Sequence, residues 1–276
     1  MRFTKMHGLG NDFIIFDAPA GGPPDAETFR RLADRYTGIG FDQALMLEPP
    51  RRTGTAVYYR IFNADGREVE QCGNGARCIA RFLHERSGAK SPDLMLDSPG
   101  GLVQAKVRGS QVSVTMGVPD FNPAALPFEA SGEAYVYPLA VGASEVEIGA
   151  VSVGNPHAVI RVPSVTDAPV SRLGPAIENH ARFPKRTNVG FMEVVDRGHI
   201  RLRVHERGTG ETRACGTGAC ASVVASARRG LTGRRAHVFL DGGALEIEWL
   251  ENNHVLMTGP VAQSFTGTLD ESLFRA

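Results

Sequence analysis

The chain contains an internal repeat, and each copy ends in a cysteine followed by a glycine-rich turn. The residues CGNGA at 72–76 return 143 positions later (215 − 72) as CGTGA at 215–219. Other polar residues return at nearly the same offset: Asn11 as Asn155, Gln43 as Asn188, and Asn63 as Glu206. A chain built this way is expected to fold into two similar halves, each presenting one thiol and a set of polar side chains. Two such halves can present one acid/base group to each face of a small molecule.

The bulk properties fit two domains of ordinary size. A length of 276 residues allows this number. Lys+Arg and Asp+Glu are both 30, so the formal net charge is zero and nothing indicates a nucleic-acid or acidic membrane partner. The N-terminus lacks an apolar signal region, and no apolar run reaches the roughly 18 residues of a membrane span. A soluble, cytoplasmic protein is expected.

The hydrophobic pattern predicts an α+β fold with the same order of elements in both halves. In the first half, strands are expected at 2–6, 12–17, 43–48, 56–62, 102–107 and 111–116. In the second half, they are expected at 148–153, 158–162, 189–195, 199–205, 236–240, 244–249 and 254–258. Helices are expected from Asp25 to Gly38 with an apolar stripe that includes Tyr36, after Cys72 to Gly88, around Leu173, and after Cys215 to Gly230.

A proline-rich segment at 118–127 is the best candidate for a linker. The last dozen residues are expected to return to the first half. The predicted domains are therefore 1–117 with 263–276, and 118–262.

The two repeated cysteines are the strongest candidates for chemistry. A glycine-rich turn that opens a helix presents unpaired backbone N–H groups and the positive end of the helix dipole. This setting stabilises a thiolate and lowers the pKa of a thiol. The same N–H groups can bind a carboxylate. Cys72 and Cys215 together would suit removal of a proton beside a carboxylate and its return from the opposite face.

The four cysteines could instead be buried core residues, metal ligands or disulfide partners. Cys78 and Cys220 lie inside the predicted helices and are expected to be buried apolar residues. The spacings Cys72-x5-Cys78 and Cys215-x4-Cys220 lack the tight knuckle of a zinc site, so no metal is expected. Four cysteines are too few for a disulfide scaffold. A non-catalytic metal or redox module remains the alternative from a different class.

Several polar residues gain interest from their place in the repeat. His157 follows Asn155 in a turn, where it could be catalytic or simply packed. Glu206 and Arg207 could form a surface ion pair, or could hold an ammonium and a carboxylate respectively. Four asparagines lie near predicted turns, and any one of them taken singly would be interpreted as a turn residue: Asn11, Asn63, Asn155 and Asn188. Their recurrence in both halves favours ligand binding.

No cofactor is expected. The chain has no Gly-x-Gly-x-x-Gly fingerprint after a strand, and none of its lysines has a setting that suggests a pyridoxal-phosphate Schiff base. Without a cofactor, the protein itself must stabilise the negative charge that forms beside a carboxylate.

At this point the motifs identify a resemblance. The sequence closely resembles the diaminopimelate epimerase family in KMHGLGNDF (5–13), GIGFDQ (38–43), RIFNADG (60–66), QCGNGARC (71–78), SVGNPH (152–157), NVGFM (188–192) and ERGTGETRACGTGA (206–219). It implies two pseudo-symmetric α+β domains, each a mostly antiparallel sheet wrapped around a central helix, with the active site in the cleft between them. It also implies cofactor-independent interconversion of LL- and meso-diaminopimelate, and a homodimer.

The resemblance implies roles for individual residues. Cys72 and Cys215 would be the acid/base pair, and His157 and Glu206 match positions linked to catalytic activity. The reacting carboxylate would be bound by the backbone of Gly73, Asn74, Gly216 and Thr217. The distal amino-acid end would be held by Asn63, Asn155, Asn188, Glu206 and Arg207, and Asn11 and Gln43 would also line the site.

The departures from the family pattern are small. Thr217 stands where many relatives have Ser, and Thr209 where many have Ala. The backbone N–H of Thr217 is retained, so the carboxylate clamp is unaffected. Proline and hydroxyproline racemases or epimerases of the same superfamily are the nearest enzymatic alternative. Glu206 and Arg207 distinguish the two, since proline has no distal amino-acid group for them to hold.

Overall fold

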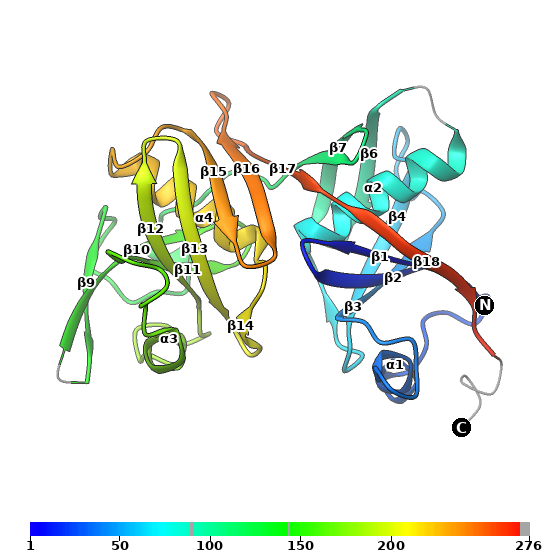
Figure 1. The fold of residues 1–276 in the computed structure, drawn as a ribbon, viewed down its shortest axis with the longest axis horizontal. Helices are drawn as coiled ribbons and strands as arrows, with labels where there is room; N and C mark the ends of the chain where they lie inside the picture. The colour runs from blue at the N-terminus through cyan, green and yellow to red at the C-terminus, as the bar shows by residue number, and fades with distance from the viewer. Residues whose placement is uncertain (89–90, 143, 271–276) are drawn as a thin grey trace. The chain divides into compact units, whose positions relative to one another are not determined.

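The computed structural model describes residues 1–88, 91–142 and 144–270, and the chain divides into two compact units. Unit 1 comprises Met1–Val114 and the segment from Gly259 onward, and unit 2 comprises Thr115–Thr258. Both units contain strands and helices, coloured along the chain in Figure 1.

Unit 1 is built from two helices of the described chain and a set of mainly antiparallel strands. The helices are α1 (Ala26–Ala33) and α2 (Gly73–Ser87). The strands are β1 (Arg2–Gly8), β2 (Asn11–Asp17), β3 (Gln43–Glu48), β4 (Val57–Asn63), β5 (Glu68–Val69), β6 (Asp93–Ser98), β7 (Gly101–Arg108), β8 (Gln111–Thr115) and β18 (Ala262–Thr268). Phe29 of α1 stacks on Phe62 of β4 with ring centroids 4.7 Å apart, so α1 packs on the sheet through its apolar face.

Unit 2 repeats this arrangement. Its α-helices are α3 (Val170–Glu178) and α4 (Gly216–Arg228), and a short 3₁₀ helix, η1, spans Pro123–Ala125. Its strands are β9 (Tyr137–Val141), β10 (Ser144–Ser152), β11 (Pro156–Arg161), β12 (Asn188–Asp196), β13 (His199–Glu206), β14 (Gly210–Thr212), β15 (Arg235–Leu240), β16 (Gly243–Trp249) and β17 (Val255–Pro260).

The strand pairing follows the repeat closely. In unit 1, β3 is parallel to β2 and antiparallel to β4, and β4 is parallel to β6. In unit 2, β12 is parallel to β11 and antiparallel to β13, and β13 is parallel to β15. An antiparallel strand also completes each set, β18 against β1 and β9 against β10. The predicted α+β fold is confirmed.

A pair of equivalent ion pairs shows how far the repeat extends. Arg60 of β4 contacts Glu68 of β5 through two hydrogen bonds of 2.7 and 2.6 Å. Arg203 of β13 contacts Glu211 of β14 in the same way, at 2.6 and 3.0 Å. Each bidentate ion pair fixes a short strand, β5 or β14, against its neighbour just before the helix that follows Cys72 or Cys215.

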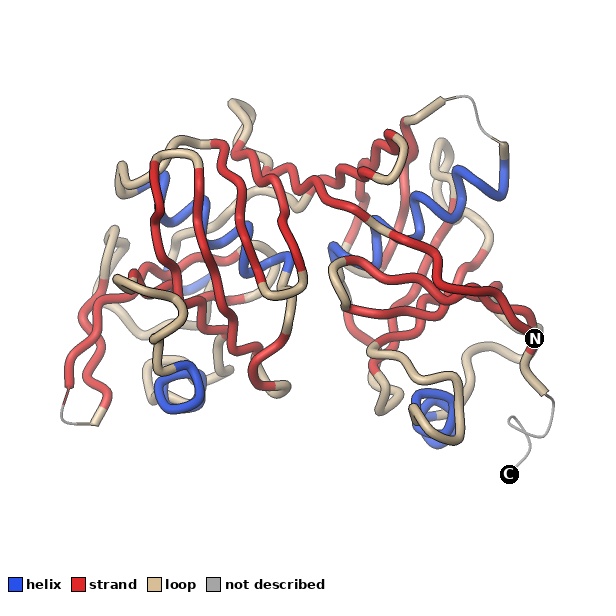
Figure 2. Tube along the Cα trace, viewed as in Figure 1, coloured by secondary structure: helices blue, strands red, loops and turns tan. Residues whose placement is uncertain are grey.

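Helix α4 lies at the centre of unit 2. All of its residues from Gly218 to Ser226 are buried, and it contacts strands on several sides, from β10 to β13 as well as β15 and β16. A helix that is apolar around its whole circumference is stable only when it is enclosed. Figure 2 shows α4 surrounded by strands within its unit.

Helix α2 has the corresponding place in unit 1, where it contacts β1, β2, β6 and β7. It ends at Ser87, and Gly88 follows in the left-handed conformation at φ 59°, as the sequence predicts. Its buried face is not purely apolar, because Asn74 and the fully buried Arg77 belong to it. The apolar pattern alone did not indicate these two polar positions.

The predicted end of α1 is wrong. The helix stops at Ala33, and Tyr36, assigned to its apolar stripe, is 97% exposed. The Asp34 carboxylate accepts hydrogen bonds from the backbone of Tyr36 and Thr37 at 2.9 and 2.7 Å. This local turn competes with a further helical turn and redirects the chain. The predicted start is right, since the Asp25 side chain accepts from the Thr28 N–H at 2.7 Å.

Candidate active site

In unit 1, Cys72 is the N-cap residue, immediately before α2 begins at Gly73. Its backbone is extended, at φ −147° and ψ 107°, and its side chain accepts a hydrogen bond from the Gly75 N–H. The Sγ lies 3.4 Å from that nitrogen and is partly accessible. The strand-to-helix turn therefore places the sulfur at the positive end of the helix dipole, as predicted.

Two asparagines surround this sulfur. Asn11 begins β2 after the tight turn that follows β1, and its Oδ1 lies 3.9 Å from the Cys72 Sγ. Asn74, in the first turn of α2, donates to the same Asn11 oxygen at 3.2 Å. The structure thus places Asn11 beside Cys72 and Asn74, which lie 61 and 63 positions further along the chain.

Gln43 and Asn63 form a second polar pair in unit 1. They face each other across β3 and β4, and Gln43 donates its amide to Asn63 Oδ1 at 2.9 Å. Gln43 Oε1 is buried and has no hydrogen-bond partner within the described ranges. Since buried polar atoms are ordinarily paired, this oxygen is available to a ligand N–H.

In unit 2, Cys215 is likewise the N-cap residue, immediately before α4 begins at Gly216. Its side chain accepts from the Gly218 N–H at 3.3 Å, and its Sγ lies 3.5 Å from the Thr217 hydroxyl. The residue is 3% exposed. Burial raises the pKa of the Cys215 thiol well above its usual range, and the Glu206 carboxylate adds to this, while Thr217 and Gly218 partly oppose it. Burial therefore outweighs the helix terminus at this cysteine and favours its neutral thiol form.

Glu206 ends β13, and its carboxylate has a fixed partner. Thr212 of β14 donates a short hydrogen bond from its hydroxyl to Glu206 Oε1. Since β13 and β14 pair antiparallel with Glu206 opposite Gly210, the carboxylate stays beside the strand that leads to Cys215. This explains its effect on the Cys215 thiol.

His157, Asn155 and Thr217 form a hydrogen-bonded row. The His157 Nε2 lies 3.0 Å from Asn155 Oδ1, and Asn155 Nδ2 donates to the Thr217 hydroxyl at 3.4 Å. His157 is fully buried. Burial, with a smaller contribution from Arg207, lowers the pKa of His157 to about 3. The ring is therefore neutral near pH 7, and its buried Nδ1 has no hydrogen-bond partner in the described part of the chain.

Asn188 and Arg207 lie in adjoining segments of unit 2. The Asn188 amide donates to the Pro156 carbonyl at 2.9 Å and accepts from the Arg207 N–H at 3.0 Å. The Arg207 side chain is exposed and donates to the Lys185 carbonyl at 3.2 Å. Asn188 thus holds two backbone segments, whereas the Arg207 guanidinium is accessible to a ligand.

The remaining cysteines have the environment expected of them. Cys78 and Cys220 are fully buried inside α2 and α4. Burial raises the pKa of Cys78 to about 12, so it is an unreactive thiol. Among the described residues, no cluster of three or more His, Cys, Asp or Glu side chains is arranged to hold a metal ion. Nor does any helix in that part of the chain have the length and apolarity to cross a membrane.

Two residues that support the site were missed in the sequence. Asp42, from the loop before β3, accepts from the Asn11 amide at 2.9 Å. Glu178, at the end of α3, accepts from the Gly208 N–H at 2.7 Å and contacts His205 at 2.8 Å. Both are carboxylates far in sequence from the residues they hold, so no local pattern identified them. Asp42 belongs to GIGFDQ (38–43), one of the stretches that resemble the family, and this was the available signal.

The fold is shared with solved structures. The chain is similar to a crystal structure of a hydroxyproline epimerase from Agrobacterium vitis, with a TM-score of 0.68 and 16% identity, covering 97% of this chain and 91% of that one. It is also similar to a phenazine biosynthesis protein from Enterococcus faecalis, with a TM-score of 0.66 and 14% identity, covering 96% and 97%. The architecture is thus the two-domain α+β fold of these proteins.

The sequence relationship is narrower. The diaminopimelate epimerase family model matches residues 3–122 and 149–263. The diaminopimelate epimerase of Nitrosomonas europaea is 53% identical over 273 residues, covering 98% of this chain and 99% of that protein. The diaminopimelate epimerase of Acinetobacter baylyi is 49% identical over 279 residues, covering 100% and 99%. The chain belongs to the diaminopimelate epimerase family, as its motifs predicted.

Proposed function

We propose that the protein converts LL-2,6-diaminopimelate to meso-2,6-diaminopimelate, and the reverse, without a cofactor, in lysine and peptidoglycan-precursor biosynthesis. Family membership supports the reaction. The observation that carries the assignment of residues is the equivalent placement of Cys72 and Cys215, each the N-cap of a buried helix with a backbone N–H on its sulfur.

The proposed chemistry is a proton exchange at one α-carbon. Cys215 begins as a thiol, since burial and Glu206 raise its pKa. Cys72 then serves as the thiolate that removes the α-proton, and Cys215 delivers its proton to the opposite face. Cys72 ends as a thiol and Cys215 as a thiolate, so charge and protons balance. In the reverse direction the two sulfurs exchange roles.

The carboxylate beside the reacting carbon needs stabilisation as negative charge develops on it. Backbone N–H groups of the two helix entrances, at Gly73, Asn74, Gly216 and Thr217, are assigned this role. Such groups are already oriented before the reaction, and loss of one typically costs about 10²–10³ in rate.

The distal amino-acid end is assigned to a group of polar residues contributed by both units. Arg207 offers an exposed guanidinium for its carboxylate, and Glu206 a carboxylate for its ammonium. The unpaired Gln43 Oε1 suits an ammonium N–H as well. The remaining members of the assigned binding set are Asn11, Asn63, Asn155 and Asn188.

His157 is assigned a supporting role in catalysis. It is neutral and its Nε2 lies against Asn155, which in turn donates to Thr217 beside Cys215. A neutral ring buried in this way cannot exchange protons readily near pH 7. It therefore contributes by fixing the Asn155 amide, and Glu206 contributes by keeping Cys215 protonated.

The deciding experiment follows the α-hydrogen in heavy water. LL-diaminopimelate is incubated with reduced protein in D₂O, and proton NMR monitors loss of the α-proton signal and formation of the meso isomer. The wild type is expected to catalyse both. Cys72→Ala and Cys215→Ala are expected to abolish epimerisation while circular dichroism shows an unchanged fold. Full activity in either variant would remove the two-thiol assignment, and no exchange by the wild type would remove the reaction.

The proposal extends to the setting of the enzyme. We place it in the cytoplasm, where a reducing environment keeps both thiols free. We also propose that it forms a homodimer, which sedimentation velocity of the purified protein would test.

A further inference from the structure

The direction of the Asn11 side-chain amide is the starting point. Its Nδ2 donates to Asp42 Oδ2 at 2.9 Å, and its Oδ1 accepts from Asn74 at 3.2 Å. The same Oδ1 lies 3.9 Å from the Cys72 Sγ. In this direction the amide presents an acceptor, not a donor, to the sulfur.

A chain of hydrogen bonds with unambiguous ends determines this direction. At one end, the buried Arg77 guanidinium, which can only donate, contacts Asn74 Oδ1 at 2.5 Å. Asn74 must then donate its Nδ2 to Asn11, and Asn11 must donate its own Nδ2 to Asp42. At the other end, the Asp42 carboxylate can only accept. Reversing the Asn11 amide would set oxygen against carboxylate and NH₂ against NH₂.

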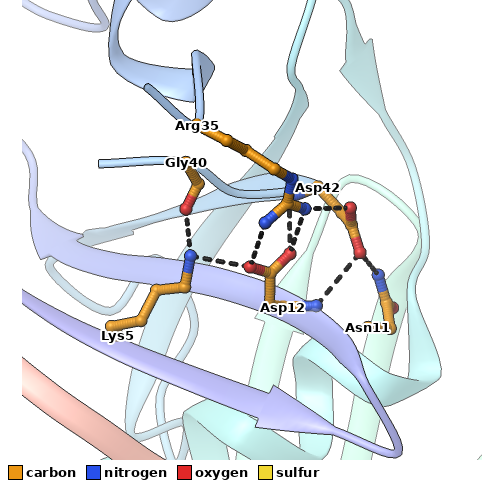
Figure 3. Close-up of polar contacts among 6 residues, drawn as sticks. All are labelled: Lys5, Asn11, Asp12, Arg35, Gly40 and Asp42. Atoms are coloured by element: carbon orange, nitrogen blue, oxygen red, sulfur yellow. Dashed lines mark hydrogen bonds and ion pairs between the residues drawn. The ribbon is translucent and has the colours of Figure 1, made fainter. Parts of the chain in front are cut away.

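Asp42 is itself held firmly. Its Oδ2 accepts from the Asp12 N–H at 3.1 Å, and its Oδ1 accepts from Arg35 at 2.8 Å. Arg35 also contacts both oxygens of Asp12, at 2.9 Å each. The Lys5 ammonium completes the network 2.7 Å from Asp12 Oδ2. Figure 3 shows the carboxylate of Asp42 between Arg35 and Asn11.

We propose that Asp42 is a positioning residue that holds the Asn11 carbonyl oxygen toward Cys72, where it accepts a hydrogen bond when that sulfur becomes a thiol. The inference rests on the proposed role of Cys72 as an acid/base group. The Gly75 N–H stabilises the thiolate, whereas the Asn11 oxygen stabilises the thiol formed after proton abstraction. Asp42 thereby keeps the thiolate basic enough to take a proton from carbon.

The ionisation of Cys72 can be measured separately from that of the buried groups beside it. Two titratable side chains that interact with it electrostatically are Tyr59 of β4 and Cys78 of α2. Burial raises the pKa of both, so neither contributes a charge near neutral pH. Cys72 is also the one partly accessible cysteine, because Cys78, Cys215 and Cys220 are buried.

The test measures ionisation of Cys72 directly. Ligand-free wild type, Asp42→Ala and Asp42→Asn are treated with iodoacetamide between pH 5 and 10, and modification of the Cys72 peptide is followed by mass spectrometry. In Asp42→Ala the Asn11 amide loses the acceptor that fixes its NH₂, so that only the Asn74 donor then opposes a turn of that NH₂ toward the thiolate. The pH midpoint of modification is expected to fall by about half a unit to one unit, and kcat at the pH optimum by about threefold.

The Asp42→Asn variant separates position from charge. It removes the negative charge but keeps an oxygen that accepts from the Asp12 N–H and from Asn11. Its pH midpoint of modification is expected within about 0.2 unit of the wild type, which is a smaller shift than the one expected for Asp42→Ala. Equal shifts in both variants would mean that only charge matters and would overturn the proposal. So would an unchanged midpoint in folded Asp42→Ala, whose altered side chain is 43% exposed in the wild type.

A measurement on the wild type needs no variant. Neutron diffraction of deuterated crystals distinguishes ND₂ from oxygen at Asn11. Deuterons facing Asp42 are expected, and oxygen in that place would overturn the inference. Neither the pH midpoint of modification nor the neutron result depends on turnover. Absence of epimerase activity would therefore reject the proposed function and leave the Asp42 result to be judged separately.

Discussion

His157 and Asn155 lie side by side in unit 2, with the imidazole Nε2 3.0 Å from the amide oxygen. An amide oxygen only accepts, so Nε2 carries the ring proton and the neutral tautomer is defined. Burial lowers the pKa of His157 to about 3. This histidine is thus a fixed neutral donor, and its titration has consequences for stability.

We expect the protein to lose stability on acidification because of His157. Below pH 6.5 an unfolded His157 binds a proton that the folded form refuses until about pH 3. The stability is therefore present above pH 6.5 and falls with decreasing pH across this window, by up to about 1.4 kcal/mol per pH unit. Urea unfolding at several pH values measures the slope.

The control for this prediction is a variant at the same position. His157→Gln should show a slope shallower by about one proton, because glutamine does not titrate. A wild-type slope in His157→Gln would contradict the assignment.

The two glycines whose N–H groups donate to the cysteine sulfurs, Gly75 and Gly218, are expected to differ in how well they tolerate replacement by alanine. A Cβ at Gly218 would lie 2.9 Å from the Val204 Cγ2 and 3.3 Å from the Cys215 Sγ. Gly218→Ala should therefore displace the sulfur and lower kcat by about 10²-fold. At Gly75 the nearest atom is a flexible Leu45 methyl at 3.1 Å, so Gly75→Ala should cost less than about tenfold. Steady-state rates compare the two, and an equal loss would refute the packing argument.

Glu178 is expected to be essential for the turn that carries Glu206 and Arg207. Its side chain is 7% exposed, and its carboxylate accepts from Gly208 and contacts His205 and Arg186. Glu178→Leu leaves these donors unpaired and should cost about 3–5 kcal/mol. Glu178→Gln retains an acceptor for Gly208 and should cost less. Urea unfolding measures both losses of stability. In steady-state kinetics KM is expected to change more than kcat, because the turn is assigned to substrate binding.

The buried cysteines are expected to be dispensable for activity. Cys78→Ala and Cys220→Ala each remove one buried sulfur and should cost about 1–2 kcal/mol. Both variants should retain epimerisation in the heavy-water assay, with Cys72→Ala as the inactive reference. Loss of activity in a fully folded Cys78→Ala or Cys220→Ala variant would revive the idea of a site using all four thiols.

Much of the fold follows from local patterns. The strands from Asn11 and Gln43 and the helices after Cys72 and Cys215 were predictable because apolar periodicity, glycines and caps agree there. The strand β18 was not identified. Most of its residues are exposed, and its order comes from pairing with β1 at the far end of the chain. Such long-range pairing leaves little trace in a window of sequence.

The residues of the candidate site were predictable by their recurrence, but their environment was not. The pKa of Cys215 depends on how deeply its helix is enclosed and on Glu206, nine positions away. Likewise, the direction of the Asn11 amide depends on Arg77 and Asp42, which reach it from different elements. A helix-start motif identifies a thiol, whereas tertiary packing determines its charge.

The pairing of β18 with β1 makes one edge of unit 1 depend on a contact between segments far apart in the sequence. The two strands pair antiparallel from Arg2 opposite Thr268 to His7 opposite Ala262, so β1 keeps an unpaired edge in any folding intermediate in which β18 has not yet docked. An unpaired edge of this kind is a template for pairing with other chains. The step that protects this edge of unit 1 is therefore the docking of a strand that follows all of unit 2 in the sequence.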